Sequence, residues 1–249
     1  MYRFALRPRW LLGHLAVLAL AVVLVSLGLW QLRRLDQRRD YNALVSRRSE
    51  TVMPLPARGW QGSTEAAGLA FRRVRVRGRY DTANEVLVRF RSNHGLPGFH
   101  VLTPMRTARG SIIVNRGWVP VDMGESWPAA AAQAPSGQTT ITGLLRQSEP
   151  AGRFLPDRRR SDAPLSVGAV NIPGLERRLS VPLYPLYLDL DGGGVRTATF
   201  PAALPAPKLD DGPHLAYAAQ WFLFAAGSAI GWAILLRSSA RRRRRALGR

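Results

Sequence analysis

The fold is decided by two stretches, LLGHLAVLALAVVLVSLGLWQL at residues 11–32 and LAYAAQWFLFAAGSAIGWAILL at residues 215–236. Each has 22 residues and contains no Asp, Glu, Lys or Arg. Because an α-helix rises about 1.5 Å per residue, either stretch is long enough to cross a hydrocarbon core of roughly 30 Å. Backbone groups in lipid must bond within their own segment, so each stretch is predicted to be a transmembrane helix.

The basic residues predict how these helices are oriented. Lys and Arg total 36, of which three precede residue 11, 26 lie between the stretches and seven follow residue 236. All 16 acidic residues lie between the stretches, so segments 1–10 and 237–249 carry only positive charge. Loops rich in Lys and Arg stay on the cytoplasmic side. We therefore predict two cytoplasmic termini and one extracytoplasmic domain at residues 33–213.

Each end of the chain has an alternative role that its sequence must be compared with. The first stretch could be a signal peptide, but no small-residue cleavage site follows it, so we expect an uncleaved anchor. The arginine-rich tail could bind nucleic acid, but it directly follows a span, which favours a topology signal attracted to anionic headgroups. Arg outnumbers Lys by 35 to 1, a composition associated with GC-rich bacterial genomes. We expect a bacterial cell-membrane protein whose partners include the lipid bilayer and no nucleic acid.

The region between the stretches is predicted to be a β-rich (α+β) domain, either barrel-like or sandwich-like. Residues 71–80 read FRRVRVRGRY, an alternation typical of a strand with one solvent-exposed face, and residues 85–91 repeat it, which predicts a hairpin. Further strands are expected at residues 99–105, 111–119, 138–147 and 181–190. Of these, 111–119 is predicted to be central, and 181–190 to be an edge strand because it contains prolines.

Helical segments are expected at residues 33–48, as an extension of the first span, and at residues 173–179. The chain contains no cysteine, so the domain must be held together by its hydrophobic core rather than by disulfides. About 180 residues are sufficient for such a core. Residues 150–164 are predicted to be mobile, and residues 191–213 to be a linker back to the membrane.

Catalytic signatures are absent from the sequence. It contains no G-x-S-x-G, no H-E-x-x-H, no phosphate-binding loop and no dinucleotide fingerprint. Asp and Glu are scattered without the spacing of a paired acid and base. The sequence therefore gives no support to a hydrolase.

Four segments, taken in order, carry a more specific signal: residues 28–35 (GLWQLRRL), 97–104 (PGFHVLTP), 114–120 (VNRGWVP) and 214–222 (HLAYAAQWF). With an apolar stretch at each end, this ordered set closely resembles the Surfeit locus protein 1 family. The resemblance covers nearly the whole chain, and only residues 129–199 match loosely.

The resemblance implies an assembly factor for a haem-copper terminal oxidase, chiefly cytochrome c oxidase, and not an enzyme. Such a factor assists delivery or insertion of haem a, or stabilises the catalytic subunit. Its implied partners are that subunit and the machinery of haem a biosynthesis. Two alternatives stay open: a haem-free scaffold that holds an oxidase assembly intermediate, and a membrane-anchored enzyme of the outer leaflet.

The resemblance also implies candidate haem-contacting residues at the outer ends of the two spans. His214 could be an axial ligand of haem iron, the sole metal ligand expected, or a plain interfacial residue. We expect an interhelical hydrogen bond between Gln31 and Gln220, at the same depth on opposite helices. A haem- or partner-contacting stripe is expected to include His214, Tyr217, Gln220 and Trp221, facing Trp30 and Gln31. The two tryptophans could instead serve only as interfacial anchors.

Two further candidates lie in the central region. Arg116 could pair with a haem propionate, because guanidinium binds carboxylate in a bidentate manner, or it could be bonded within its own domain. His100, on a predicted strand, could contact the cofactor or occupy a polar niche. In both cases the structural role is favoured.

Overall fold

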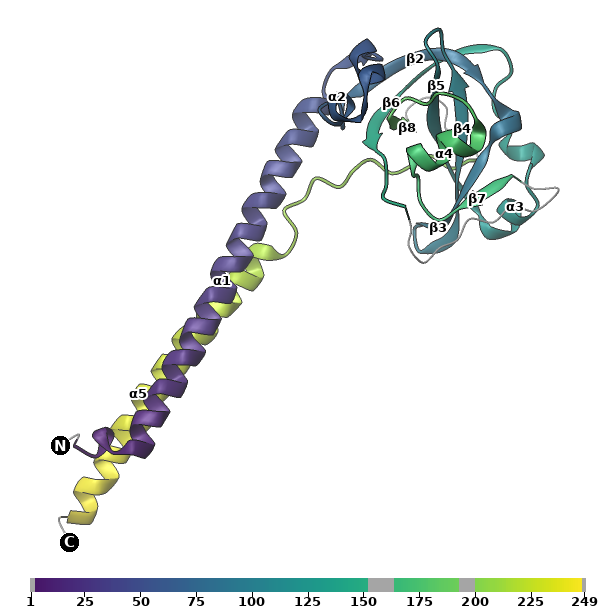
Figure 1. The fold of residues 1–249 in the computed structure, drawn as a ribbon. Coiled ribbons are helices and arrows are strands. Elements are labelled where there is room, and N and C mark those ends of the chain that lie inside the picture. Colours follow the sequence, from purple (N-terminus) through teal and green to yellow (C-terminus); the bar gives the residue numbers. More distant parts are fainter. Residues whose placement is uncertain (1–2, 152–163, 193–199, 248–249) are drawn as a thin grey trace. The chain divides into compact units, whose positions relative to one another are not determined.

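The computed structural model describes residues 3–151, 164–192 and 200–247. The chain divides into two compact units, one formed by Met1–Leu44 with Leu209–Arg249 and the other by Val45–Lys208. The first is called here the helix pair and the second the β-domain. Figure 1 shows both units in one ribbon.

The helix pair consists of α1 (Pro8–Ser49) and α5 (His214–Leu247), which lie side by side (Figure 1). Residue 14 contacts residue 232, residue 28 approaches residue 222, and residue 31 contacts residue 214, so the helices are antiparallel. The start of α1 and the end of α5 therefore lie at the same end of the pair.

The two helices meet along a seam with alternating spacings of three and four residues. In α1 the seam positions, buried or half-buried, are His14, Val17, Ala21, Leu24, Gly28, Gln31, Leu35, Arg38 and Asn42. In α5 they are His214, Ala218, Trp221, Ala225, Ser228 and Trp232. An average repeat of 3.5 residues keeps one face of a helix against its partner, as in a coiled coil.

Glycines allow the helices to approach closely. A Cβ placed on Gly28 would lie 2.6 Å from Cε1 of Phe222, and one on Gly13 would overlap the ring of Trp232. At the same end as Gly13, Nε1 of Trp232 donates a 2.8 Å hydrogen bond to Nδ1 of His14. Small residues and interhelical hydrogen bonds of this kind are typical of helix packing in membranes.

Both helices are long and apolar enough to cross a membrane. Only 11% of the most apolar window of α1 and 6% of that of α5 are buried, which is far less than a core helix of a water-soluble domain buries. Their outward faces therefore present apolar side chains to the surroundings, which indicates a membrane protein. As expected, α1 continues well beyond residue 32, and it ends at Ser49 ahead of the prolines at 54 and 56.

The described part of the β-domain contains eight strands: β1 (Val52–Pro54), β2 (Arg73–Tyr80), β3 (Val86–Asn93), β4 (Leu96–Arg106), β5 (Ser111–Pro120), β6 (Gln138–Gln147), β7 (Leu165–Val167) and β8 (Leu186–Leu190). Its helices are α2 (Ser63–Ala67), α3 (Val121–Glu125) and α4 (Ile172–Leu179). Short 3-10 helices lie at Arg3–Leu6, Ala57–Gln61, Thr82–Asn84 and Ala130–Ala132.

The sheet order is β1-β2-β6-β8-β5-β4-β3-β7, with an additional pairing between β2 and β4. That pairing, Tyr80 opposite Met105 and Arg79 opposite Arg106, closes the ring β2-β6-β8-β5-β4. The domain is therefore a five-stranded barrel extended by β1, β3 and β7, and the barrel alternative of the sequence prediction is the one observed. Most neighbours are antiparallel, whereas β1–β2, β5–β8 and β3–β7 are parallel.

The inward faces of these strands form the core. One cluster fills the barrel with residues that include Val74, Val76, Met105, Ile112, Leu145 and Leu188. A second cluster packs α4 against β3, β4 and β5 through residues that include Ile172, Leu175, Val88 and Leu102. Along β2 the valines are buried and Arg75, Arg77 and Arg79 are exposed, as the alternation predicted.

Two strand predictions were wrong. β2 and β3 do not form a hairpin, because β2 pairs with β1, β6 and β4, whereas β3 pairs with β4 and β7. β8 is not an edge strand, since it lies between β5 and β6. Both prolines that suggested an edge, Pro182 and Pro185, precede β8, which begins at Leu186.

Other predictions were confirmed. β5 is a buried central strand, β6 has the predicted bounds, and α4 carries Pro173 in its first turn after the capping side chain of Asn171. The strand expected at residues 99–105 is β4, which is longer and begins at Leu96, after a turn at His94 and Gly95. The segment predicted to be mobile lies largely outside the described residues.

Candidate functional site

His214 and Gln31 are in contact at one end of the apolar part of the helix pair. His214 is the first residue of α5, and its Nδ1 lies 3.0 Å from Oε1 of Gln31 on α1. An amide oxygen can only accept a hydrogen bond, so Nδ1 of His214 is the donor. In the neutral ring, the lone pair then resides on Nε2.

The residues that precede His214 are held against α1 by polar contacts. The backbone oxygen of Asp210 accepts hydrogen bonds from Nδ2 of Asn42 at 2.9 Å and from Nε of Arg38 at 3.1 Å. Asp211 forms an ion pair with Arg39 at 2.9 Å. Exposed ion pairs contribute at most about 1 kcal/mol each. Together, however, these contacts fix where the chain enters α5, and so where His214 lies.

The remaining candidates at this end of the pair face in different directions. Trp221 is half-buried in the seam, with its ring 6.1 Å from that of Phe224. Trp30 and Tyr217 are 49% and 48% exposed, and Gln220 is also exposed, so these three point away from the seam. The structure brings Gln31 together with His214, and the expected partner Gln220 lies on the outward face.

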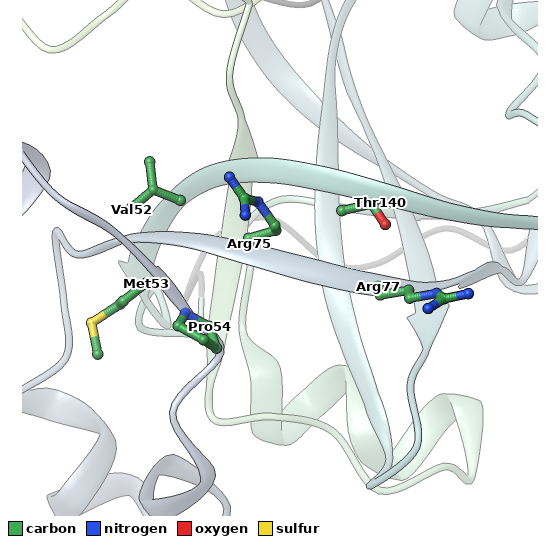
Figure 2. Close-up of a pocket in the computed structure, with 6 residues that line it drawn as sticks. All are labelled: Val52, Met53, Pro54, Arg75, Arg77 and Thr140. Carbon is green, nitrogen blue, oxygen red and sulfur yellow. The ribbon is translucent and has the colours of Figure 1, made fainter.

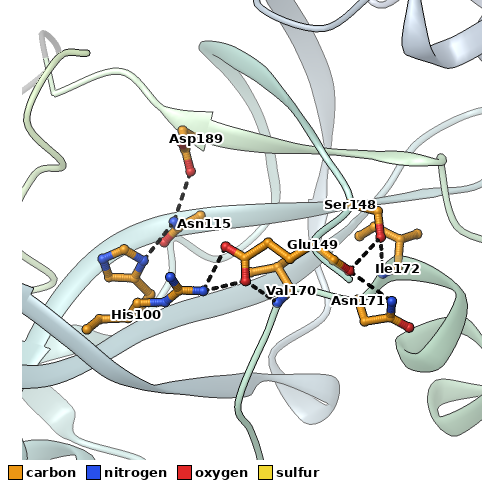
Figure 3. Close-up of polar contacts among 9 residues, drawn as sticks. His100, Asn115, Ser148, Glu149, Val170, Asn171, Ile172 and Asp189 are labelled. Carbon is orange, nitrogen blue, oxygen red and sulfur yellow. Dashed lines mark hydrogen bonds and ion pairs between the residues drawn. The ribbon is translucent and has the colours of Figure 1, made fainter. Parts of the chain in front are cut away.

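His100 lies in a polar network inside the β-domain (Figure 3). Its Nδ1 accepts a 3.2 Å hydrogen bond from Nδ2 of Asn115, which also donates to Oδ1 of Asp189 at 2.9 Å. Burial and the nearby charge of Arg91 lower the pKa of His100 to about 4, although Glu149 opposes this shift. Burial raises the pKa of Asp189, against the effect of Arg146.

Glu149, which follows β6, belongs to a second cluster of polar contacts in the β-domain. Its carboxylate accepts hydrogen bonds from Nη2 of Arg91 at 2.6 and 2.8 Å and from the backbone N–H of Val170 at 2.9 Å. Nδ2 of Asn171, the cap of α4, donates to the backbone oxygen of Glu149 at 2.9 Å. His100 is therefore bonded to β5 and, through Asn115, to β8, while the charges of Arg91 and Glu149 act on it from nearby. These surroundings favour the role of a residue in a polar niche.

Arg116 is buried inside the β-domain and bonded to its own strands. Its guanidinium contacts Glu85 at 3.0 Å, the hydroxyl of Thr103 at 2.9 Å and the backbone oxygen of Ala132 at 2.7 Å. Burial lowers the pKa of Arg116, and the Glu85 carboxylate opposes that shift. These contacts favour the structural role of Arg116 over propionate binding.

A cavity of about 250 Å³ opens on the surface of the β-domain, beside β1, β2 and β6. Figure 2 shows its lining residues, Val52, Met53, Pro54, Arg75, Arg77 and Thr140. The two arginines belong to the exposed face of β2, and Arg77 donates to Oε1 of Gln138 at 3.2 Å. Within the described residues, no group of three or more His, Cys, Asp or Glu side chains is arranged to hold a metal ion.

The chain has an apolar helix on each side of a closed β-barrel in the sequence, and a histidine at the end of the apolar part of the helix pair. These features define a membrane-anchored β-domain protein. Comparison with known proteins gives the family. A model described as "SURF1 family" matches residues 18–226, so this chain belongs to the SURF1 family. Members of that family are known as cytochrome c oxidase assembly factors; they are generally non-enzymatic and are linked to haem a insertion.

Individual relatives agree with this assignment. The chain is 27% identical over 241 residues to a SURF1-like protein of Monosiga brevicollis, covering 91% of this chain and 88% of that protein. It is 28% identical over 150 residues to Surfeit locus protein 1 of Takifugu rubripes, covering 53% of this chain and 60% of that protein. A SURF1-like protein of Rickettsia felis is 24% identical over 232 residues, covering 90% of this chain and 97% of that protein.

The residues at the end of the helix pair suit a haem cargo. An axial position on haem iron requires one neutral imidazole nitrogen, and His214 has Nε2 available once Nδ1 is bonded to Gln31. The exposed rings of Trp30 and Tyr217 are suited to an apolar macrocycle near a membrane surface.

The sequence alone missed the Gln31–His214 pair and the contacts of Asp210 and Asp211. Antiparallel alignment of the two apolar stretches would have placed Gln31 within one helical turn of His214, but no motif in the sequence selects that contact.

Proposed function

We propose that this protein assists delivery or insertion of haem a into the catalytic subunit of cytochrome c oxidase. It acts as an assembly factor, not as an enzyme, and haem a is its transient cargo. The observation that carries the proposal is the hydrogen bond between Gln31 and His214, which leaves one imidazole nitrogen free to bind iron. Membership of a family linked to haem a insertion supports the same conclusion.

The proposed arrangement places the apolar parts of α1 and α5 across a bacterial cell membrane, at residues 11–32 and 215–236. Segments 1–10 and 237–249 are cytoplasmic, and residues 33–213 are extracytoplasmic. The acid-free basic tail supports this orientation. His214 then lies at the outer surface, where an amphipathic macrocycle can rest between headgroups and protein.

Each group of residues has a defined part in this function. His214 binds the iron of the cargo, and Trp30, Tyr217, Gln220 and Trp221 provide the surface around it. The contacts of Asp210 and Asp211 with α1 keep His214 at a fixed depth. Partners of the protein are the oxidase catalytic subunit and the machinery that makes haem a. The central domain provides a surface for the subunit.

The experiment measures oxidase assembly in cells that make haem a. The gene is deleted, and the haem a content of the oxidase catalytic subunit in membranes is compared after complementation with the natural chain or with His214→Ala. We expect the natural chain to restore haem a and the variant to restore subunit abundance but not haem a. Full restoration of haem a by the variant would instead support the haem-free scaffold.

A further inference from the structure

The two ring nitrogens of His214 have different surroundings. Nδ1 lies 3.0 Å from Oε1 of Gln31, whereas Nε2 has no hydrogen-bond partner among the described residues. A Cβ added to Gly212, which has a φ of +66°, would lie 3.6 Å from Nε2, so glycine at this position keeps a side chain away from that edge of the imidazole.

Gln31 is a polar residue in an otherwise apolar part of the helix seam. The seam positions before and after it, Leu24, Gly28 and Leu35, are apolar and buried. A polar side chain in such a seam costs free energy unless it forms a hydrogen bond, and its partner is His214. The polar residue is therefore placed where it meets the imidazole.

Resting on the function proposed above, we propose that Gln31 is a positioning residue for His214. Its amide oxygen accepts the Nδ1–H of the imidazole, which fixes the ring orientation and leaves Nε2 as the nitrogen that binds the haem iron. Metal-binding histidines in general donate their second ring N–H to a carbonyl or a carboxylate, which fixes the tautomer. Gln31 supplies the carbonyl here.

The other histidines with described partners differ from His214 in this respect. Nδ1 of His14 accepts a hydrogen bond from Trp232, and Nδ1 of His100 accepts one from Asn115, so neither nitrogen carries the proton. His214 is therefore expected to be the Nδ1–H tautomer while these two are Nε2–H tautomers. They serve as references within the same molecule.

The first test reads the tautomer without haem. The full chain, labelled with ¹⁵N-histidine and purified in detergent, is studied by NMR spectroscopy, and the His214 signals are assigned by their loss in His214→Ala. We expect Nδ1–H for His214 in the natural chain and a mixture of tautomers in Gln31→Leu. An Nε2–H tautomer for His214 in the natural chain would overturn the positioning role.

The second test titrates the same full-length variants with ferric protoporphyrin IX and follows absorbance. Loss of such a supporting hydrogen bond typically weakens metal binding about 10- to 100-fold, so Gln31→Leu should lose that much affinity. Gln31→Glu retains the acceptor and should bind nearly as well as the natural chain. Gln37→Leu is the matched control, because Gln37 is at an exposed position of α1 and its oxygen accepts a hydrogen bond from Arg34 of the same helix.

The outcomes separate the two proposals. If the natural chain and Gln31→Leu bind the porphyrin equally well, the positioning role is wrong, although haem binding stands. If the natural chain binds neither this porphyrin nor haem a, both the proposed haem function and the proposed role of Gln31 are wrong. Weak binding by Gln31→Leu with rescue by Gln31→Glu supports both.

Discussion

Glu85 and Arg116 form an ion pair at 3.0 Å in which both side chains are buried, 8% and 4% exposed. Glu85 also accepts hydrogen bonds from the Thr103 hydroxyl at 2.7 Å and from Nε1 of Trp127 at 3.0 Å. The guanidinium lies over the ring of Tyr80, with Cζ 5.9 Å from its centroid. This pair therefore connects β2, β4 and β5 with the segments that follow β2 and α3.

Removing the arginine should destabilise the β-domain strongly. Arg116→Met leaves the Glu85 carboxylate buried without its counter-charge, and breaking a buried pair in this way costs about 3–5 kcal/mol. The free energy of unfolding is measured by urea denaturation of the full chain in detergent. Tryptophan fluorescence is the reporter, because Trp60, Trp118 and Trp127 lie in the β-domain and Trp127 contacts Glu85 directly.

Arg73→Met is the control for that experiment. Arg73 pairs with Asp191 at 3.3 Å, and the two side chains are 42% and 29% exposed, so its loss should cost at most about 1 kcal/mol. Equal losses of stability in the two variants would show that burial of the Glu85–Arg116 pair has no special importance.

Acidification should weaken the β-domain through His100. Burial and Arg91 lower the pKa of His100 to about 4, below the usual 6.5, so the unfolded chain binds the proton more readily. The stabilisation is complete above pH 6.5 and is lost as the pH falls toward 4. Denaturation between pH 7 and 4 should show this slope, and His100→Gln should reduce it. An unchanged slope in His100→Gln would assign the acid sensitivity to other groups.

The packing of the helix pair is predicted to depend on Gly28. A side chain there overlaps Phe222, so Gly28→Leu should push α1 and α5 apart. Gly227 has no atom within 4 Å of an added Cβ, so Gly227→Leu is the matched control. Because the chain has no cysteine, spin labels can be attached through Leu20→Cys and Ile230→Cys. Electron paramagnetic resonance should show a longer distance between the two spin labels in Gly28→Leu than in the natural sequence or in Gly227→Leu. Equal label-to-label distances in all three forms would contradict the packing of α1 and α5 along this seam.

The orientation in the membrane can be measured by cysteine labelling. Leu96→Cys is placed at a residue that is 62% exposed on the β-domain, and Arg241→Cys lies in the basic tail. In spheroplasts, a membrane-impermeant maleimide should label the first site directly and the second only after the membrane is permeabilised. The reverse pattern would place the β-domain in the cytoplasm.

Much of the fold was predictable from local sequence patterns. Two uncharged stretches predicted the long helices, and alternation along residues 73–80 predicted β2, because burial on one face of a strand imposes a period of two. Strand pairing was not predictable in the same way. The predicted hairpin of β2 and β3 failed because the barrel closes through contacts distant in sequence, with β2 pairing with β6.

The candidate site was predictable as a region but not as a set of contacts. Sequence reasoning placed His214 and Gln31 at the same end of the two helices, but it paired Gln31 with Gln220. The seam spacing turns Gln220 outward and brings the first residue of α5 to Gln31 instead. Which face of a helix meets its neighbour depends on packing along its whole length, and that is not contained in any one motif.

The central claim, that His214 binds haem a, is tested most directly by an absorption spectrum. The protein is purified in detergent from cells that make haem a, beside His214→Ala and the control His94→Ala, which changes a turn residue of the β-domain. We predict a haem a band in the natural chain and in His94→Ala that is lost in His214→Ala. A band that persists in His214→Ala would contradict the claim.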